Sequence, residues 1–243
     1  MTSIPTPDLS GRRVLIPGGT GAVGEGVVRR YLAAGADVVV PSRSAARADE
    51  FRRVLGDAAT ERLHLVVHDY TTFPGAEDLI ARMQSSLGGV DDVVAPIGGW
   101  WAGKRLWQID EADWQAAFVG LATTHLAVLR AALPAMSSRG AYTVVVGDSA
   151  TWPVPGSGLV SMEQAAVLMM QRVAAAEHGV ERRIFAFVLG PVATRLAGGG
   201  TVTADQIGAV AAAASAAMLS GREIRLHDQT EVDQALGLLG GTR

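Results

Sequence analysis

A glycine-rich loop near the amino terminus has the residue types and spacing best suited to chemistry. The segment Pro17 to Gly24 reads Pro-Gly-Gly-Thr-Gly-Ala-Val-Gly and directly follows the apolar run Val14 to Ile16. Because glycine lacks a Cβ atom, such a loop turns tightly and brings backbone amides close to a phosphate. The helix expected next adds unpaired amides and a positive dipole end. A dinucleotide diphosphate is therefore predicted to bind the backbone of Gly18, Thr20, Gly21 and Val23.

A positive charge follows the second apolar run, at the position where dinucleotide-binding proteins select their cofactor. Ser42 and Arg43 come after Val38 to Val40. An acidic residue there would hold both ribose hydroxyls of NAD, whereas a hydroxyl and a guanidinium suit a 2′-phosphate. The sequence therefore favours NADP over NAD.

Four further side chains are candidates for proton chemistry. Asp148 and Ser149 follow the run Tyr142 to Val146, where ligands of α/β proteins bind. Asp148 can act as an acid or base if burial raises its pKa, and an ordinary turn is the alternative. His125 can move protons if its helical face meets the substrate, and helix packing is the alternative. Glu163 stands near a helix start, where it either caps the helix or takes part in catalysis.

Short β-branched runs alternate with longer stretches rich in Ala, Arg and Leu along the chain. Several runs are apolar throughout, as expected of parallel strands buried on both faces. The predicted strands are Arg13–Ile16, Asp37–Val40, Leu63–Val67, Asp92–Ala95, Tyr142–Val146, Ile184–Val188 and Glu223–Leu226. The predicted helices lie near 22–34, 45–56, 75–87, 111–136, 159–178 and 204–219. This alternation predicts a single α/β domain over residues 1–243, a Rossmann-type doubly wound parallel sheet of about seven strands with helices on both faces.

With this order and spacing, the chain resembles the short-chain dehydrogenase/reductase family along nearly its whole length. The resemblance rests on the glycine loop, on the end of the second strand and on four later segments. These are His68-Asp69-Tyr70, Leu129 to Met136, Leu189 to Thr194 and Gly221 to Leu226. It implies an oxidoreductase that uses NADP or, less favoured here, NAD. It also implies cofactor contacts from Asp69, Ala95, Gln164, Pro191, Val192 and Thr194.

The catalytic positions of that family carry other residues here. Members have a Tyr-x-x-x-Lys pair on the fifth helix, and alignment puts Val160 and Gln164 at these positions. Leu121 stands where the family has an asparagine, and only its serine has a counterpart, in Ser149. Valine has no proton to give, while glutamine can hydrogen-bond a ribose hydroxyl but carries no charge. The usual carbonyl-reductase mechanism is therefore not expected.

Three hypotheses about function stay open. The first is an NADP-dependent oxidoreductase for a small apolar or aromatic substrate, in which Ser149, Asp148 or water supplies the proton. The second is a cofactor-binding protein without redox activity, acting as a sensor or structural partner. The third is a lyase, isomerase or cyclase on the same fold. Four tryptophans in loops after the fourth and fifth strands either line an apolar substrate pocket or cover the core: Trp100, Trp101, Trp107 and Trp152.

Composition excludes several other classes of function. A formal net charge of −3 gives no case for nucleic acid or an anionic membrane as a partner. The chain has no cysteine, which excludes disulfides and thiolate sites and fits the cytoplasm. Its five histidines show no metal-ligand spacing, so no metal site is expected, and no membrane span is expected either. The soft fifth helix, with Met162, Met169 and Met170, predicts a homodimer or homotetramer.

Overall fold

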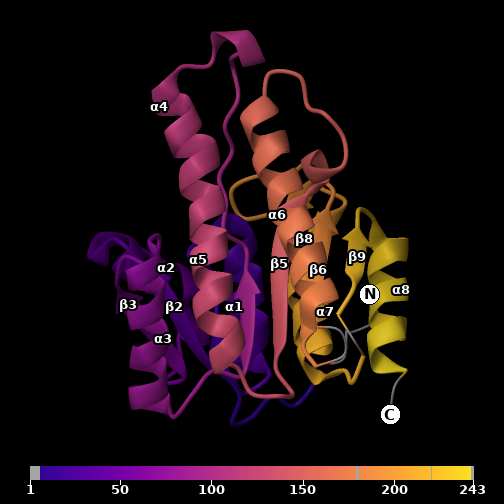
Figure 1. Ribbon diagram of the computed structural model, residues 1–243. Coiled ribbons are helices and arrows are strands. Elements are labelled where there is room, and N and C mark those ends of the chain that lie inside the picture. Colours follow the sequence, from indigo (N-terminus) through magenta and orange to yellow (C-terminus); the bar gives the residue numbers. More distant parts are fainter. Residues whose placement is uncertain (1–5, 179–180, 220, 242–243) are drawn as a thin grey trace.

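Seven parallel strands form the centre of the computed structural model, which describes residues 6–178, 181–219 and 221–241 (Figure 1). Their order across the sheet is β3-β2-β1-β4-β5-β6-β9, and all six neighbouring pairs are parallel. The strands are β1 (Arg13–Leu15), β2 (Asp37–Ser42), β3 (Leu63–Val67), β4 (Asp92–Ala95), β5 (Ala141–Gly147), β6 (Arg183–Leu189) and β9 (Glu223–Leu226). The predicted doubly wound sheet is confirmed.

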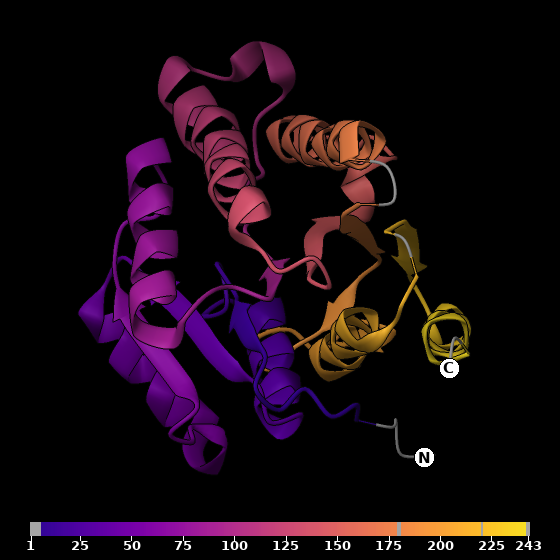
Figure 2. The same ribbon diagram turned by 60° about the horizontal axis from the view of Figure 1, so that its bottom comes forward.

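Helices cover both faces of this sheet, as Figure 2 shows. Apolar residues of four helices share one core cluster: α1 (Ala22–Ala33), α2 (Ala45–Leu55), α7 (Ala204–Ala216) and α8 (Gln229–Gly240). Those of three helices share the other: α3 (Phe73–Leu87), α5 (Gly120–Ala135) and α6 (Gly158–His178). Strand residues alternate between the clusters, with Val14 in the first and Leu15 in the second. Burial on both faces explains why the strands are apolar throughout.

The structure corrects the predicted helices in two places. The helix expected over 111–136 is divided into α4 (Glu111–Trp114), a π-helical turn (Gln115–Val119) and α5. In this turn Trp114 stacks on Phe118, with ring centroids 4.3 Å apart. Helix α8 was not predicted at all. It begins at the cap Asp228, whose side chain accepts a hydrogen bond from the backbone of Glu231, and it packs on α7 and β9.

A short parallel ladder joins β7 (Val192–Ala193) to β8 (Val202–Thr203), outside the main sheet. The strands flank the glycine-rich segment from Leu196 to Gly200, which the structure leaves without helix or strand. This ladder fixes both ends of the segment that follows β6.

One stretch in the described part of the chain, Glu111–Ala135, is long and apolar enough to cross a membrane by length and composition alone. Helices in the cores of soluble proteins pass the same test. Here α5, which makes up most of the stretch, packs against α3 and α6.

Candidate functional site

The glycine loop forms a cradle that has no room for side chains at two positions. Gly18 has φ of +83°, and a Cβ atom on it would lie 2.4 Å from the carbonyl oxygen of Pro96. A Cβ atom on Gly24 would lie 2.4 Å from the carbonyl oxygen of Gly18. Gly21 is the N-cap residue of α1, so the helix begins inside the loop. The cradle therefore places backbone amides and a helix N-terminus at the carboxyl end of β1, as a diphosphate site requires.

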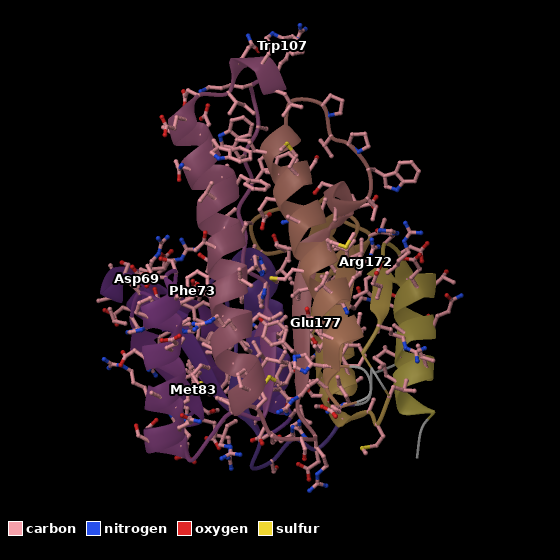
Figure 3. All side chains as sticks on the ribbon, in the orientation of Figure 1. Asp69, Phe73, Met83, Trp107, Arg172 and Glu177 are labelled. Carbon is pink, nitrogen blue, oxygen red and sulfur yellow. The ribbon has the colours of Figure 1, made fainter. Side chains whose placement is uncertain are left out.

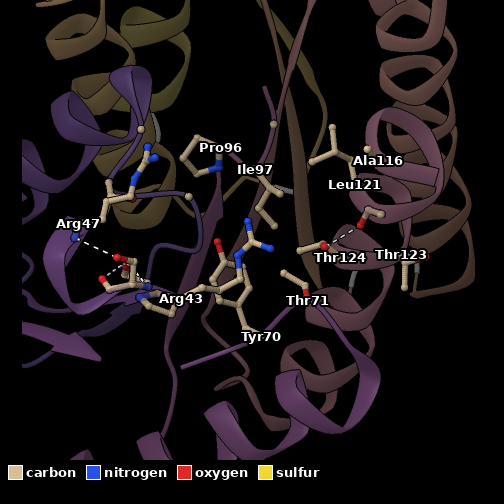
Figure 4. Close-up of a pocket in the computed structure, with 18 of the residues that line it drawn as sticks. Arg43, Arg47, Tyr70, Thr71, Pro96, Ile97, Ala116, Leu121, Thr123 and Thr124 are labelled. Atoms are coloured by element: carbon tan, nitrogen blue, oxygen red, sulfur yellow. Dashed lines mark hydrogen bonds between the residues drawn. The ribbon is translucent and has the colours of Figure 1, made fainter. Parts of the chain in front are cut away.

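A cavity of about 750 Å³ opens from this cradle (Figure 4). Its walls come from the loops after β1, β2, β3 and β4 and from the helical segment of residues 115–124. Of the predicted cofactor residues, those that line it are Gly18, Thr20, Gly21, Ser42 and Arg43. The cavity and cradle together fit an extended nucleotide with a diphosphate.

Two arginines lie on the cavity beside the end of β2. Arg43 was predicted from the sequence, but Arg47, one helical turn later, was missed. Arg47 Nε donates a hydrogen bond to Thr20 Oγ1 over 3.1 Å, which ties α2 to the glycine loop. The Ser42 hydroxyl is buried and donates to the carbonyl oxygen of Ser44 at 2.9 Å. The spacing of four residues between the arginines was the signal in the sequence that could have pointed to Arg47.

The other predicted cofactor residues lie outside the cavity lining in the described structure. Asp69 Oδ1 accepts hydrogen bonds from the backbone and hydroxyl of Thr71, which lower the pKa of this carboxyl. The neighbours Tyr70 and Thr71 line the cavity in its place. Ala95 is completely buried at the end of β4. Val23 packs against the core as the second residue of α1.

The predicted segment after β6 lies against the first turn of α1. Thr194 lines a smaller cavity of about 230 Å³, together with Ala22 and Glu25. Arg195 Nε lies 3.1 Å from a carboxylate oxygen of Glu25. Val192 belongs to the β7–β8 ladder, and Pro191 precedes it. These contacts place the segment beside the glycine loop's helix.

Gln164 and Glu163 form a buried network below the end of β5. The backbone amide of Gly147 donates to Gln164 Oε1, and Gln164 Nε2 donates to Glu163 Oε2 at 3.0 Å. The Gln164 amide is therefore held by protein groups at both ends. Glu163 is completely buried five residues into α6, so the interpretation of Glu163 as a helix cap is wrong. Burial raises the pKa of Glu163 to about 7.

His125 is completely buried against the same network. Its Nε2 lies 3.0 Å from the carbonyl oxygen of Ile97, which lines the cavity, and 3.8 Å from Glu163 Oε1. Burial lowers the pKa of His125 to about 4, so the ring is neutral at pH 7. A neutral ring donates its Nε2 proton to Ile97, and Nδ1 has no partner among the described residues. His125 thus supports the cavity wall from behind.

Asp148 and Ser149 follow β5 in a short turn, and the fold adds partners that the sequence did not indicate. His227 Nε2 lies 3.4 Å from Asp148 Oδ1, and His227 Nδ1 lies 3.3 Å from Glu231 Oε2. The backbone amide of His227 donates to the same Glu231 oxygen at 2.7 Å. Ser149 is half-buried in the turn beside Gly147. Asp148 is therefore paired with a histidine from the end of the sheet's last strand.

None of the three tyrosines, all in the described structure, stands at the position of Val160. Tyr31 and Tyr142 are completely buried, and burial raises the pKa of both phenols. Tyr70 lies on the cavity wall next to Arg43 (Figure 4), and burial raises its pKa too. Val160 itself is buried.

None of the four tryptophans expected to line a pocket is among the residues that line these two cavities of the described structure. The side chains of Trp100, Trp107 and Trp152 are 73%, 77% and 64% exposed, and they are absent from the lining of the two cavities described here. Figure 3 shows Trp107 at the far tip of the molecule, beyond the end of α4. The backbone amide of Gly103 donates to Gly156 at 2.9 Å, so the two tryptophan-bearing loops contact each other without closing over a cavity.

Comparison with known proteins decides the family. Residues 19–235 match a family model described as enoyl-(acyl carrier protein) reductase. The chain belongs to the short-chain dehydrogenase/reductase family. Among solved structures of this family, a short-chain dehydrogenase from Burkholderia cenocepacia J2315 in complex with NADP superimposes with a TM-score of 0.79 and 21% identity, covering 90% of this chain and 97% of that one. A putative short-chain alcohol dehydrogenase from Sinorhizobium meliloti 1021 gives a TM-score of 0.81 and 22% identity, covering 94% and 99%.

The chain covers a smaller share of its curated relatives within the family than of these solved structures. Cis-1,2-dihydrobenzene-1,2-diol dehydrogenase from Pseudomonas putida is 28% identical over 181 residues, which are 72% of this chain and 64% of that protein. Hydroxysteroid 11-beta-dehydrogenase 1-like protein from Xenopus tropicalis is 30% identical over 150 residues, or 60% of this chain and 51% of that protein. The alignments thus span between about half and two thirds of these relatives' length.

Proposed function

We propose that this short-chain dehydrogenase/reductase is an NADP(H)-dependent oxidoreductase whose active site works without the Tyr-x-x-x-Lys pair. The observation that carries the proposal is the pair Arg43 and Arg47 on the cavity that opens from the glycine cradle. A cradle that a Cβ atom would fill at Gly18 fits a diphosphate, and the cavity beside it fits the adenosine part.

The two arginines favour a phosphorylated ribose. Both guanidinium groups lie at the end of β2, where a dinucleotide-binding protein meets the 2′ position. Guanidinium groups bind phosphate through paired hydrogen bonds and keep their charge at all working pH values. Asp69, the acidic residue predicted to contact the cofactor, hydrogen-bonds Thr71 instead. NADP is therefore favoured over NAD.

The nicotinamide of such a cofactor supplies or accepts a hydride, and the chain must supply the rest. Gln164, held by Gly147 and Glu163, presents a fixed neutral amide near Gly98 on the cavity. Val160 cannot exchange a proton. The proton then comes from the groups after β5, with Asp148, Ser149 or water as candidates.

A small apolar or aromatic alcohol or ketone is the substrate class that we infer. Several relatives are named as dehydrogenases of cis-dihydrodiols of benzene, toluene and biphenyl. Their names describe small ring compounds with two hydroxyl groups. The apolar residues Ala116, Val119 and Leu121 on the cavity wall suit the same class.

The proposal is tested by titrating NADPH and NADH while following nucleotide fluorescence. We expect NADPH to bind more tightly, and Arg43→Ala and Arg47→Ala each to weaken NADPH binding about 10- to 100-fold, the cost of a charged hydrogen bond. NADH affinity should change little. Arg53→Ala is the matched control, because Arg53 is an exposed arginine of α2 that does not line the cavity.

Turnover separates the oxidoreductase from the other two hypotheses. The chain should oxidise NADPH with members of a panel of cyclic ketones and diones. Tight NADPH binding without turnover would favour a cofactor-binding protein without redox activity, which the buried Val160 and Gln164 support. Exchange of substrate hydrogen without net NADPH consumption would favour a lyase, isomerase or cyclase.

We expect this protein to act in the cytoplasm as a homodimer or homotetramer. We expect neither nucleic acid nor a membrane as its partner. Four apolar side chains on α5 and α6 are between 41% and 53% exposed: Leu126, Met162, Met169 and Val173. A second copy would cover these neighbouring helices. The pair Met169→Glu and Val173→Glu should then produce monomers in sedimentation analysis, whereas Met218→Glu, at an exposed position after α7, should not.

A further inference from the structure

Three titratable side chains from distant parts of the chain meet at the carboxyl edge of the sheet. Asp148 follows β5, His227 follows β9, and Glu231 lies in the first turn of α8. His227 stands between the two carboxylates, with Nε2 3.4 Å from Asp148 Oδ1 and Nδ1 3.3 Å from Glu231 Oε2. Both ring nitrogens therefore face a carboxylate oxygen.

Backbone contacts hold His227 in place at the end of β9. The backbone amide of His227 donates a hydrogen bond to Glu231 Oε2 at 2.7 Å, and the backbone carbonyl oxygen of His227 accepts one from Thr201 Oγ1. A Cβ atom on Gly190 would lie 3.0 Å from His227 Cα, so the backbone after β6 passes directly beside the histidine. His227 Nε2 is shielded from solvent and has no hydrogen-bond partner among the described residues, although the side chain as a whole is 26% exposed.

Asp148 is joined to the wall of the larger cavity through its neighbours, although it is not among the residues that line this cavity. It follows Gly147, whose amide is held by Gln164, and Gln164 Nε2 would lie 3.8 Å from a Cβ atom on Gly98 in the cavity wall. Asp148 Oδ1 accepts from Thr151 Oγ1 at 2.9 Å and faces His227. Its Oδ2 has no hydrogen-bond partner among the described residues, and the side chain is 40% exposed. One carboxylate oxygen thus stays available for a ligand.

We propose that Asp148 transfers the proton at the substrate oxygen and that His227, oriented by Glu231, is its proton partner. This rests on the proposed oxidoreductase function. In reduction, the carbonyl carbon gains a hydride while its oxygen takes the proton from the Asp148 carboxyl. His227 then returns a proton to Asp148, and the imidazole, whose side chain is 26% exposed, recovers one from solvent. Oxidation of an alcohol runs the same steps in reverse, so the pair does the work that Val160 cannot.

The charged groups around the pair make it suited to this exchange. The facing groups from the packed elements are the Asp148 carboxylate after β5 and the Glu231 carboxylate of α8. An imidazole between two carboxylates is held in place and can carry a proton on the side facing Asp148. A purely structural clamp between strand ends needs the ion-pair contact but no proton exchange, and this difference can be measured.

The experiment compares Asp148→Asn, His227→Gln and His227→Ala with the unchanged chain. Asparagine and glutamine keep polar contacts of similar shape but cannot pass protons. We expect kcat for ketone reduction to fall at least about 100-fold in each, with KM for the ketone and NADPH affinity changed less than about threefold. The pH profile of kcat should lose one limb, and added imidazole should restore turnover to His227→Ala. Glu231→Gln should reduce kcat less than His227→Gln.

Different results overturn different claims. NADPH turnover that survives in Asp148→Asn or His227→Gln, with an unaltered pH profile, overturns the proton pair but leaves the oxidoreductase standing. Failure of imidazole to rescue His227→Ala, when its urea unfolding midpoint without cofactor matches that of the unchanged chain, also overturns it. Absence of NADPH binding or of any turnover by the unchanged chain overturns the proposed function itself.

Discussion

Glu163 Oε1 lies 3.8 Å from His125 Nε2, and both side chains are completely buried between α5 and α6. The Nε2 proton is committed to Ile97. Neither Glu163 Oε1 nor His125 Nδ1 has a hydrogen-bond partner in the described structure. Burial therefore favours the neutral form of both residues, and this produces opposite pH dependences.

Glu163→Gln should make the protein more stable at alkaline pH. Burial raises the pKa of Glu163 to about 7 from an ordinary value of 4.5, so the folded state binds this proton more tightly than the unfolded state does. The free energy of unfolding then falls as pH rises from about 4.5 to about 7, by about 3 kcal/mol from this residue. Because glutamine does not titrate, Glu163→Gln removes this fall in the free energy of unfolding. Urea unfolding at pH 5 and pH 8.5 measures it, with the exposed Glu177→Gln of the same helix as control. A variant no more stable than the unchanged chain at pH 8.5 would contradict the prediction.

His125→Gln should make the protein less sensitive to acid. Burial lowers the pKa of His125 to about 4 from 6.5, so the unfolded state binds this proton more tightly. The contribution of His125 to the free energy of unfolding is fully present above pH 6.5. It is lost as the pH falls toward 4, and this loss amounts to about 3 kcal/mol. Glutamine can still donate to Ile97. The difference in unfolding free energy between variant and unchanged chain should therefore shift in the variant's favour between pH 7 and pH 4. A constant difference would show that the ring is charged in the folded state.

Gly18→Ala should damage both stability and nucleotide binding. Gly11 and Gly18 share a positive φ, of 77° and 83°, but an added Cβ atom meets nothing within 4 Å at Gly11 and the Pro96 oxygen at 2.4 Å at Gly18. Gly11→Ala therefore measures backbone strain alone, about 1 to 2 kcal/mol. Gly18→Ala should lower the free energy of unfolding by more than Gly11→Ala does, as measured by chemical unfolding. It should also abolish NADPH binding, as measured by fluorescence titration. Equal losses in the two variants would mean that the loop can move away from Pro96.

Asp92→Asn should be strongly destabilising although it lies far from the cavity. Arg12 Nε and Nη2 donate to the two oxygens of the completely buried Asp92, at 2.6 Å and 2.7 Å. Loss of the carboxylate leaves the arginine's charge without its partner and should cost about 3 kcal/mol or more. The control is Asp78→Asn, which breaks an ion pair with Arg82 whose side chains are 51% and 60% exposed and should cost less than about 1 kcal/mol. Chemical unfolding of both variants tests this, and similar costs would contradict it.

Much of the fold could be predicted from local patterns. Continuous apolar runs such as Val38 to Val40 fixed the strands, because strands buried on both faces need apolar residues on both. Short elements were less visible. Helix α8 follows no strong periodic signal, and the π-helical turn at Gln115–Val119 depends on how Trp114 and Phe118 stack. Such features arise from packing and not from propensity.

The chain's own order of residues therefore determined the parallel sheet and the glycine cradle at Gly18. Each follows from residue type and spacing within one segment. Only the tertiary structure decided that Arg47 reaches Thr20, that Glu163 faces His125 and that Asp148 meets His227. The members of these pairs are 27, 38 and 79 residues apart in sequence, and they meet because helices and strand ends pack together whatever their separation along the chain. The local sequence pattern contains no information on contacts between residues so far apart, because these contacts form only when the helices pack against the sheet.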